Sequence, residues 1–102
     1  MIVNKKQLKD LGFVKRGTEL ILDLLYDSFL EINIDDVDEM VKYKSDKNVC
    51  LSLRKQVDII EWSDELPGEL SLNFTFTALY IRLESFKTLE SLEDFINILK
   101  RK

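Results

Sequence analysis

The sequence predicts an α+β fold, in which an antiparallel β-sheet is flanked by a short N-terminal helix and a longer C-terminal helix. Helical spacing of apolar residues, together with capping residues, is found at the two ends of the chain. Between the ends, apolar and polar residues alternate over several segments. With 102 residues, 45% of them hydrophobic, and no linker or internal repeat, residues 1–102 are expected to form a single domain.

The terminal helices are predicted from their caps. Asn4 precedes KKQLKDLGF, where Leu8 and Leu11 share one face and Gly12 is suited to end the helix in a left-handed conformation. Thr88 precedes LESLEDFINILKRK, where acidic residues come early and basic residues late, as the helix dipole favours. The apolar face of this second helix is Leu89, Leu92, Phe95, Ile96 and Leu99.

The segment Leu20–Tyr26 is ambiguous, because acidic residues flank and interrupt it every four positions, as on a helix. Nearly every other position is apolar, so a helix there would be buried around most of its circumference, which a small domain rarely manages. A strand is favoured over the helix, turning at Asp27-Ser28 into a second strand, Phe29–Ile34.

Two further turns are predicted in the second half of the chain. SDKN at 45–48 is interpreted as a hairpin turn between the strands Met40–Lys44 and Val49–Lys55. Pro67-Gly68 fits a type II turn before a strand that begins at Leu70. The apolar phase of this strand shifts after Thr77, which predicts a bulge or a tight turn near Thr77-Ala78.

Most routes to catalysis lack their side chains here. The chain has no histidine and one cysteine, Cys50, so a Ser-His or Cys-His pair and a histidine metal ligand are excluded. Ser52 and Lys55 match an S-x-x-K pattern, but within an alternating strand they point to opposite faces, and the companion motifs are missing. We therefore predict a protein that is not an enzyme and needs no cofactor.

The acidic run at 35–39 invites a calcium interpretation, but the spacing is wrong. Counted from Asp36, the sixth and twelfth positions of an EF-hand loop hold Val41 and Lys47 instead of glycine and glutamate. We predict a solvated acidic loop and no metal site. Cys50, between apolar neighbours, is predicted to be a buried free thiol.

The net charge of −4 disfavours direct nucleic-acid binding. No signal segment and no apolar run of about 18 residues is present, so a cytoplasmic protein that does not insert into a membrane is expected.

Tyr80 and Trp62 can be core residues or interface anchors, and core packing is the more frequent role. Trp62, surrounded by acids, fits a rim facing a basic partner. The predicted partner-binding residues are Asp35, Asp36, Asp38, Glu39, Glu61, Trp62, Asp64 and Glu65.

The two ends of the chain, KKQLKDLGFVK and SFKTLESLEDFINILKRK, carry a resemblance. They are similar to small uncharacterised proteins of phages and mobile genetic elements, which often open with a helix ending in L-G-F and close with a K-T-L-E-x-L helix. The resemblance implies a context in which small acidic proteins bind and block host proteins, including the basic, nucleic-acid-handling machines of bacterial immunity.

The expected function is that of a small non-enzymatic binding protein, a phage-encoded, anti-CRISPR-like inhibitor that binds a basic host defence protein through its acidic surface. It would act as a monomer or as a homodimer formed through a strand edge. A toxin-neutralising immunity protein is one alternative, which a neighbouring toxin gene would indicate. A small histidine-independent hydrolase is another.

Overall fold

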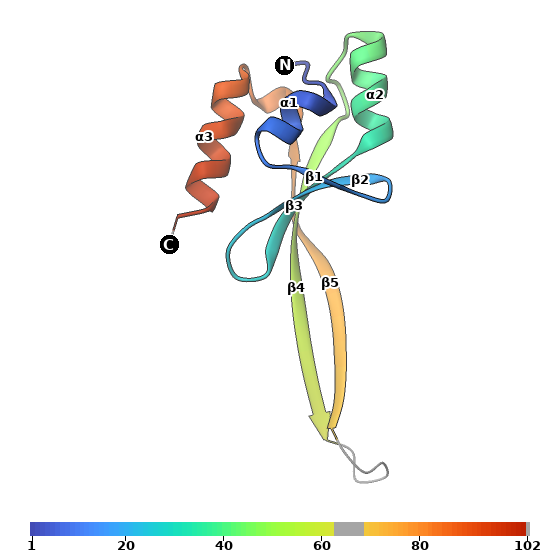
Figure 1. Ribbon diagram of the computed structural model, residues 1–102, viewed down its shortest axis with the longest axis vertical. Helices are drawn as coiled ribbons and strands as arrows, with labels where there is room; N and C mark the ends of the chain where they lie inside the picture. Colours follow the sequence, from blue (N-terminus) through green and yellow to red (C-terminus); the bar gives the residue numbers. More distant parts are fainter. Residues whose placement is uncertain (63–68, 102) are drawn as a thin grey trace.

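The computed structural model describes residues 1–62 and 69–101, and side chains outside 58–73. In this part of the chain, five strands form one antiparallel sheet in the order β1-β2-β3-β4-β5. The helices gather around one end of the sheet, and β4 and β5 extend from it as a two-stranded arm (Figure 1). The elements are α1 (Lys5–Asp10), β1 (Val14–Arg16), β2 (Glu19–Asp23), β3 (Ser28–Asn33), α2 (Ile34–Tyr43), β4 (Cys50–Trp62), β5 (Glu69–Arg82), the 3-10 helix η1 (Leu83–Ser85) and α3 (Leu89–Leu99). The predicted α+β fold, with its short N-terminal and longer C-terminal helix, is confirmed.

Helix α1 begins and ends as its sequence predicts. The Asn4 side chain accepts a hydrogen bond from the Gln7 N–H at 2.8 Å, and the Asn4 N–H donates to the Gln7 side chain at 2.9 Å. These two bonds form a capping box, which satisfies N–H groups at the start of the helix. Gly12 follows with a φ of +115°, and Phe13 then enters the core.

Helix α2 was not predicted from the sequence. Residues 35–39 were expected to be a loop and Met40–Lys44 a strand, and both predictions are wrong. The Asn33 side chain accepts a hydrogen bond from the Asp36 N–H at 3.1 Å and caps the helix, and Val37 and Met40, one turn apart, are buried. Residues 45–48 therefore connect a helix to β4, and they are not a hairpin turn.

The strand interpretation of the ambiguous segment is correct. Leu20 and Leu22 are buried in β2, opposite Ile32 and Leu30 of β3. However, β2 ends at Asp23, earlier than predicted, and residues 24–27 make the reversal that was expected at Asp27-Ser28. Two of these residues, Tyr26 and Asp27, take left-handed backbone angles within the reversal.

The arm is a consequence of unequal strand lengths. Strand β3 pairs with β4 only between Ser52 and Lys55, so beyond Lys55 the strands β4 and β5 pair only with each other in the described residues. Leu53 faces Leu79 and Arg54 faces Thr77, which leaves Ala78 as an extra residue in β5. Of the two predicted alternatives at Thr77-Ala78, the bulge is the correct one. The predicted Pro67-Gly68 turn lies outside the described residues.

Helix α3 packs its apolar face on the body. The Thr88 side chain caps it by accepting a hydrogen bond from the Ser91 N–H at 3.1 Å. Leu92 and Ile96 are buried, whereas Phe95 is half-buried, with its ring centroid 5.4 Å from that of Phe86. The core consists of Val3, Leu8, Phe13, Leu20, Leu22, Leu30, Ile32, Val37, Met40, Val49, Leu51, Leu83, Leu92 and Ile96.

Cys50 is half-buried at the start of β4, so the expected full burial of its thiol is wrong. Among the described residues, none of the helices has the length and apolar character needed to cross a membrane.

Candidate functional site

Four of the predicted partner-binding residues lie on helix α2. Asp35, Asp36, Asp38 and Glu39 are all exposed, and the first two stand in the first turn, where the helix dipole favours negative charge. The carboxylate of Asp38 lies 3.2 Å from the Lys5 ammonium of α1. Both side chains of this pair are about half exposed, so the pair contributes little to stability, but it offsets part of the acidic charge.

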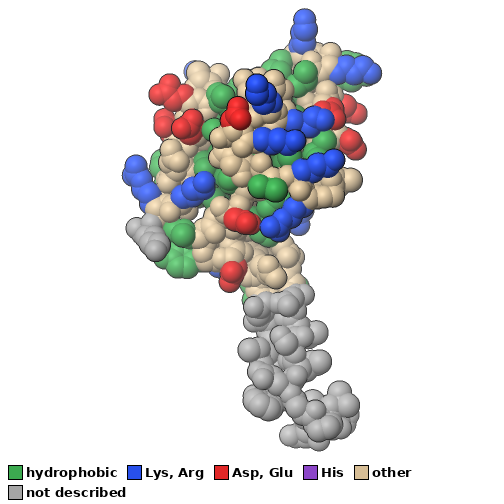
Figure 2. Space-filling model, in the orientation of Figure 1, with side chains coloured by type: hydrophobic (Ala, Val, Ile, Leu, Met, Phe, Trp, Pro, Cys, Tyr) green, Lys and Arg blue, Asp and Glu red, His purple; other side chains and the backbone are tan. Residues whose placement is uncertain are grey.

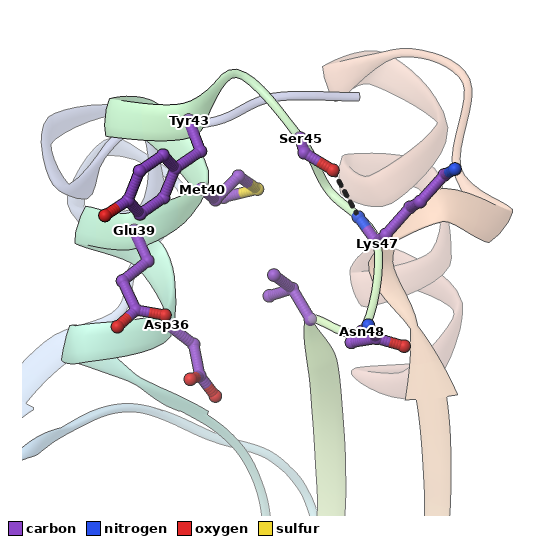
Figure 3. Close-up of a pocket in the computed structure, with 8 residues that line it drawn as sticks. Asp36, Glu39, Met40, Tyr43, Ser45, Lys47 and Asn48 are labelled. Carbon is purple, nitrogen blue, oxygen red and sulfur yellow. Dashed lines mark hydrogen bonds between the residues drawn. The ribbon is translucent and has the colours of Figure 1, made fainter.

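A shallow pocket of about 230 Å³ lies between α2 and the segment that follows it (Figure 3). Asp36, Glu39 and Tyr43 line one wall. Met40, also on α2, belongs to the same wall, and the other wall is formed by Ser45, Lys47, Asn48 and Val49. Figure 3 shows the carboxylates of Asp36 and Glu39 extending from α2, while the Lys47 side chain points away from them.

This pocket is an open surface depression with a mixed polar and apolar lining. Among residues 1–57 and 74–101, whose side chains the structure describes, no group of three or more metal-ligating side chains is found. Beside it, the carboxylate of Asp46 accepts a hydrogen bond from the N-terminal ammonium of Met1, and this bond lowers the pKa of Asp46 below its usual value of 3.8. An ionised carboxylate in this position ties the start of the chain to the loop before β4.

Of the other predicted partner-binding residues, the structure places the backbone of two, Glu61 and Trp62. Glu61 and Trp62 end β4, at the opposite end of the molecule from α2 (Figure 1). Asp64 and Glu65 lie outside the described residues. The described backbone therefore places Glu61 and Trp62 away from the four acidic residues of α2.

The charges of the chain are unevenly divided along the sequence. Of the 19 acidic residues, five (Asp58, Glu61, Asp64, Glu65 and Glu69) lie in a stretch without any Lys or Arg, so the other 14 nearly balance the 15 basic residues. Figure 2 agrees, because blue and red side chains are interspersed on the face of the body that it shows. The net negative charge thus comes from residues 58–69, the arm sequence.

The arm also exposes aromatic side chains of β5. Phe74 and Phe76 are 46% and 45% exposed, and they lie on one face of β5 beside Val57 and Lys55 of β4. Tyr80, for which core packing was the favoured prediction, is 65% exposed on the opposite face, so that prediction is wrong.

The length of β5 is consistent with this exposure. A strand of 14 residues spans about 46 Å at about 3.3 Å per residue. The radius of gyration of a compact 100-residue domain is only about 13 Å, so part of a strand of this length must extend beyond the hydrophobic core.

The remaining motif has no catalytic arrangement. Ser52 and Lys55 lie three residues apart in β4 and so on opposite faces of the sheet. The Lys55 ammonium donates a hydrogen bond to the backbone carbonyl of Tyr26, on the loop between β2 and β3. Lys55 thus fastens the base of the arm to the body.

Comparisons of this chain with protein-family models, with curated proteins and with solved structures find no match.

Proposed function

We propose that this chain is a non-enzymatic protein-binding module that holds its partner with the β4–β5 arm. The observation that carries the proposal is the arm itself, which leaves the body at Lys55 and exposes Phe74 and Phe76. A two-stranded hairpin alone is marginally stable in water, and uncovered aromatic rings add to the cost of leaving it free. A partner that covers these rings gains apolar burial and stabilises the arm.

The partner has a basic surface in this proposal. The negative charge of the arm sequence attracts a positive surface over long range, and the aromatic rings provide rigid contact area once the two proteins meet. Charge then governs the association rate, whereas the rings govern the dissociation rate. The acids of α2 add to the attraction from a distance but lie at the other end of the molecule.

The resemblance of the terminal segments to small phage proteins leads us to propose a cytoplasmic setting. The partner would be a host defence protein with a basic, nucleic-acid-handling surface, and the chain its stoichiometric inhibitor.

The test compares two variants with the wild type in binding to proteins captured from host lysate. Phe74→Ser with Phe76→Ser should raise the dissociation rate severalfold or abolish binding, because the exposed rings are lost while the buried core is unchanged. Neutralising the four α2 acids to Asn and Gln should only slow association modestly. Neutral replacements are needed because lysine in the first turn of α2 would oppose the helix dipole.

Salt provides the control for the charge argument. Raising ionic strength from about 50 mM to about 500 mM shortens the Debye length roughly threefold, so association of the wild type should slow. Binding that survives the loss of both phenylalanines, with an unchanged dissociation rate, would contradict the proposal.

A further inference from the structure

The outer edge of β5 lacks the protection that edge strands normally have. In the part of the chain that the structure describes, β5 is the last strand of the sheet. Its 14 residues carry charges only at the two ends, Glu69 and Arg82, with no proline between them. The opposite edge strand, β1, has only three residues, two of which, Lys15 and Arg16, are basic and exposed. Short length and exposed charge are usual protections against edge-to-edge pairing, and β5 has neither along its middle.

Strand β5 is also complementary to itself when it is read in the antiparallel direction. Because Ala78 is the extra residue of the bulge, Ala78 and Leu79 together occupy one position along the strand. Counted in this way, six positions lie on each side of Thr75. Positions equally far from Thr75 then hold residues of like or complementary kind: Phe74 and Phe76, Asn73 and Thr77, Leu72 and Leu79, Ser71 and Tyr80, Leu70 and Ile81, Glu69 and Arg82.

This symmetry is what a two-fold interface requires, because the same strand must serve as both partners. We propose that two copies of this chain pair their β5 strands antiparallel, with the two-fold axis at Thr75, and form one continuous ten-stranded sheet. Phe74 then faces Phe76 of the second copy, and Glu69 takes the register position across from Arg82 of the second copy. Parallel pairing would place like charges together, so the charges select the antiparallel arrangement.

A second copy of the chain is the favoured partner for the β5 edge. In the antiparallel pair, the charges at the strand ends and the apolar and polar positions between them all match. Four phenylalanine rings, two from each copy, would gather on one face of the joined sheet, and cross-strand aromatic pairs stabilise such sheets. This face stays open for another protein, so dimerisation does not depend on the proposed function and can be measured on the purified chain alone.

The first experiment measures mass in solution by analytical ultracentrifugation. Between about 1 μM and about 500 μM, a range where an interface of modest size assembles, the wild type should approach twice its chain mass of 12.0 kDa. Thr75→Lys should stay at the monomer mass, because the axis sets two like charges against each other. Gln56→Lys, which puts the same charge at the facing position of β4, is the matched control and should still dimerise.

Mixing provides the rescue. Thr75→Lys and Thr75→Asp, each monomeric alone, should form a one-to-one heterodimer, since only this register brings residue 75 of one copy against residue 75 of the other. A foreign strand as the true occupant would leave all variants monomeric, and this result would overturn the proposal. A dimer that Thr75→Lys leaves intact would overturn it as well.

Cross-linking tests the register without adding a charge. Both cysteine variants are made in a Cys50→Ser background, so that the introduced thiol has no competitor. Facing Cα atoms of an antiparallel pair lie about 4.5–5.5 Å apart, within the range of a disulfide. Thr75→Cys should therefore form a disulfide-linked dimer under mild oxidation, and Thr77→Cys should do so at least tenfold more slowly. Equal rates for the two variants would overturn the proposed register.

Discussion

Replacing Leu92 with alanine should cost about 2–5 kcal/mol of unfolding free energy, as is typical when a fully buried leucine is truncated. Leu92 is 0% exposed on the face of α3 that packs on the core, and its loss leaves a cavity there. Ile98, on the same helix, is 59% exposed, and replacing it with alanine should change stability by no more than about 0.5 kcal/mol. The two variants remove a similar aliphatic side chain from one helix.

The assay is urea unfolding followed by far-ultraviolet circular dichroism, with thermal melting as a second measurement. In a domain of this size, about 1 kcal/mol corresponds to about 4–8 °C in melting temperature, so Leu92→Ala should melt at least about 8 °C below the wild type. Phe95→Ala should fall between the two variants, because the ring is half-buried and not fully buried. Equal midpoints for Leu92→Ala and Ile98→Ala would refute the docking of α3 on the core.

Two further substitutions test local features of the body. Asp46→Asn should destabilise the protein at neutral pH, because the bond from the Met1 ammonium lowers the pKa of Asp46 in the folded state. The stabilisation from the ionised carboxylate is complete above about pH 3.8 and is lost as the pH falls through the lowered pKa. Urea midpoints of the wild type and Asp46→Asn should therefore converge in acid, and a difference that persists there would contradict this origin. Gly12→Ala should cost about 1–3 kcal/mol, because the added Cβ would lie 2.8 Å from a methyl carbon of Leu22 in a backbone conformation with a φ of +115°. Gly17→Ala is the control, since its φ is also positive but no atom lies within 4 Å of the added carbon, and equal losses for both glycines would show that the contact with Leu22 is unimportant.

The terminal helices could be predicted from the sequence because their signals are local. A cap such as Asn4 or Thr88 bonds to an N–H only three residues away, and the apolar spacing that follows belongs to the same helix. An irregularity near Thr77-Ala78 was predictable for the same reason, because the change of alternation phase is local, but the choice between a bulge and a tight turn came from the structure.

Helix α2 escaped prediction although its signals were also present. The alternation of β3 continues to Ile34 without a break, and the acids that follow resemble a loop. The buried positions Val37 and Met40 have helical spacing, but this pattern competes with the strand pattern that precedes it. Packing against the sheet decided between the two.

The site was set by tertiary structure. Alternation in β5 indicates that Phe74 and Phe76 share a face, but it cannot say whether anything covers that face, because cover comes from elements distant in the sequence. Strand β3 stops pairing with β4 at Lys55, and this length difference leaves the arm uncovered. Local periodicity thus determined which residues point the same way, whereas only the assembled sheet decided which of them meet solvent and which edge is free to bind.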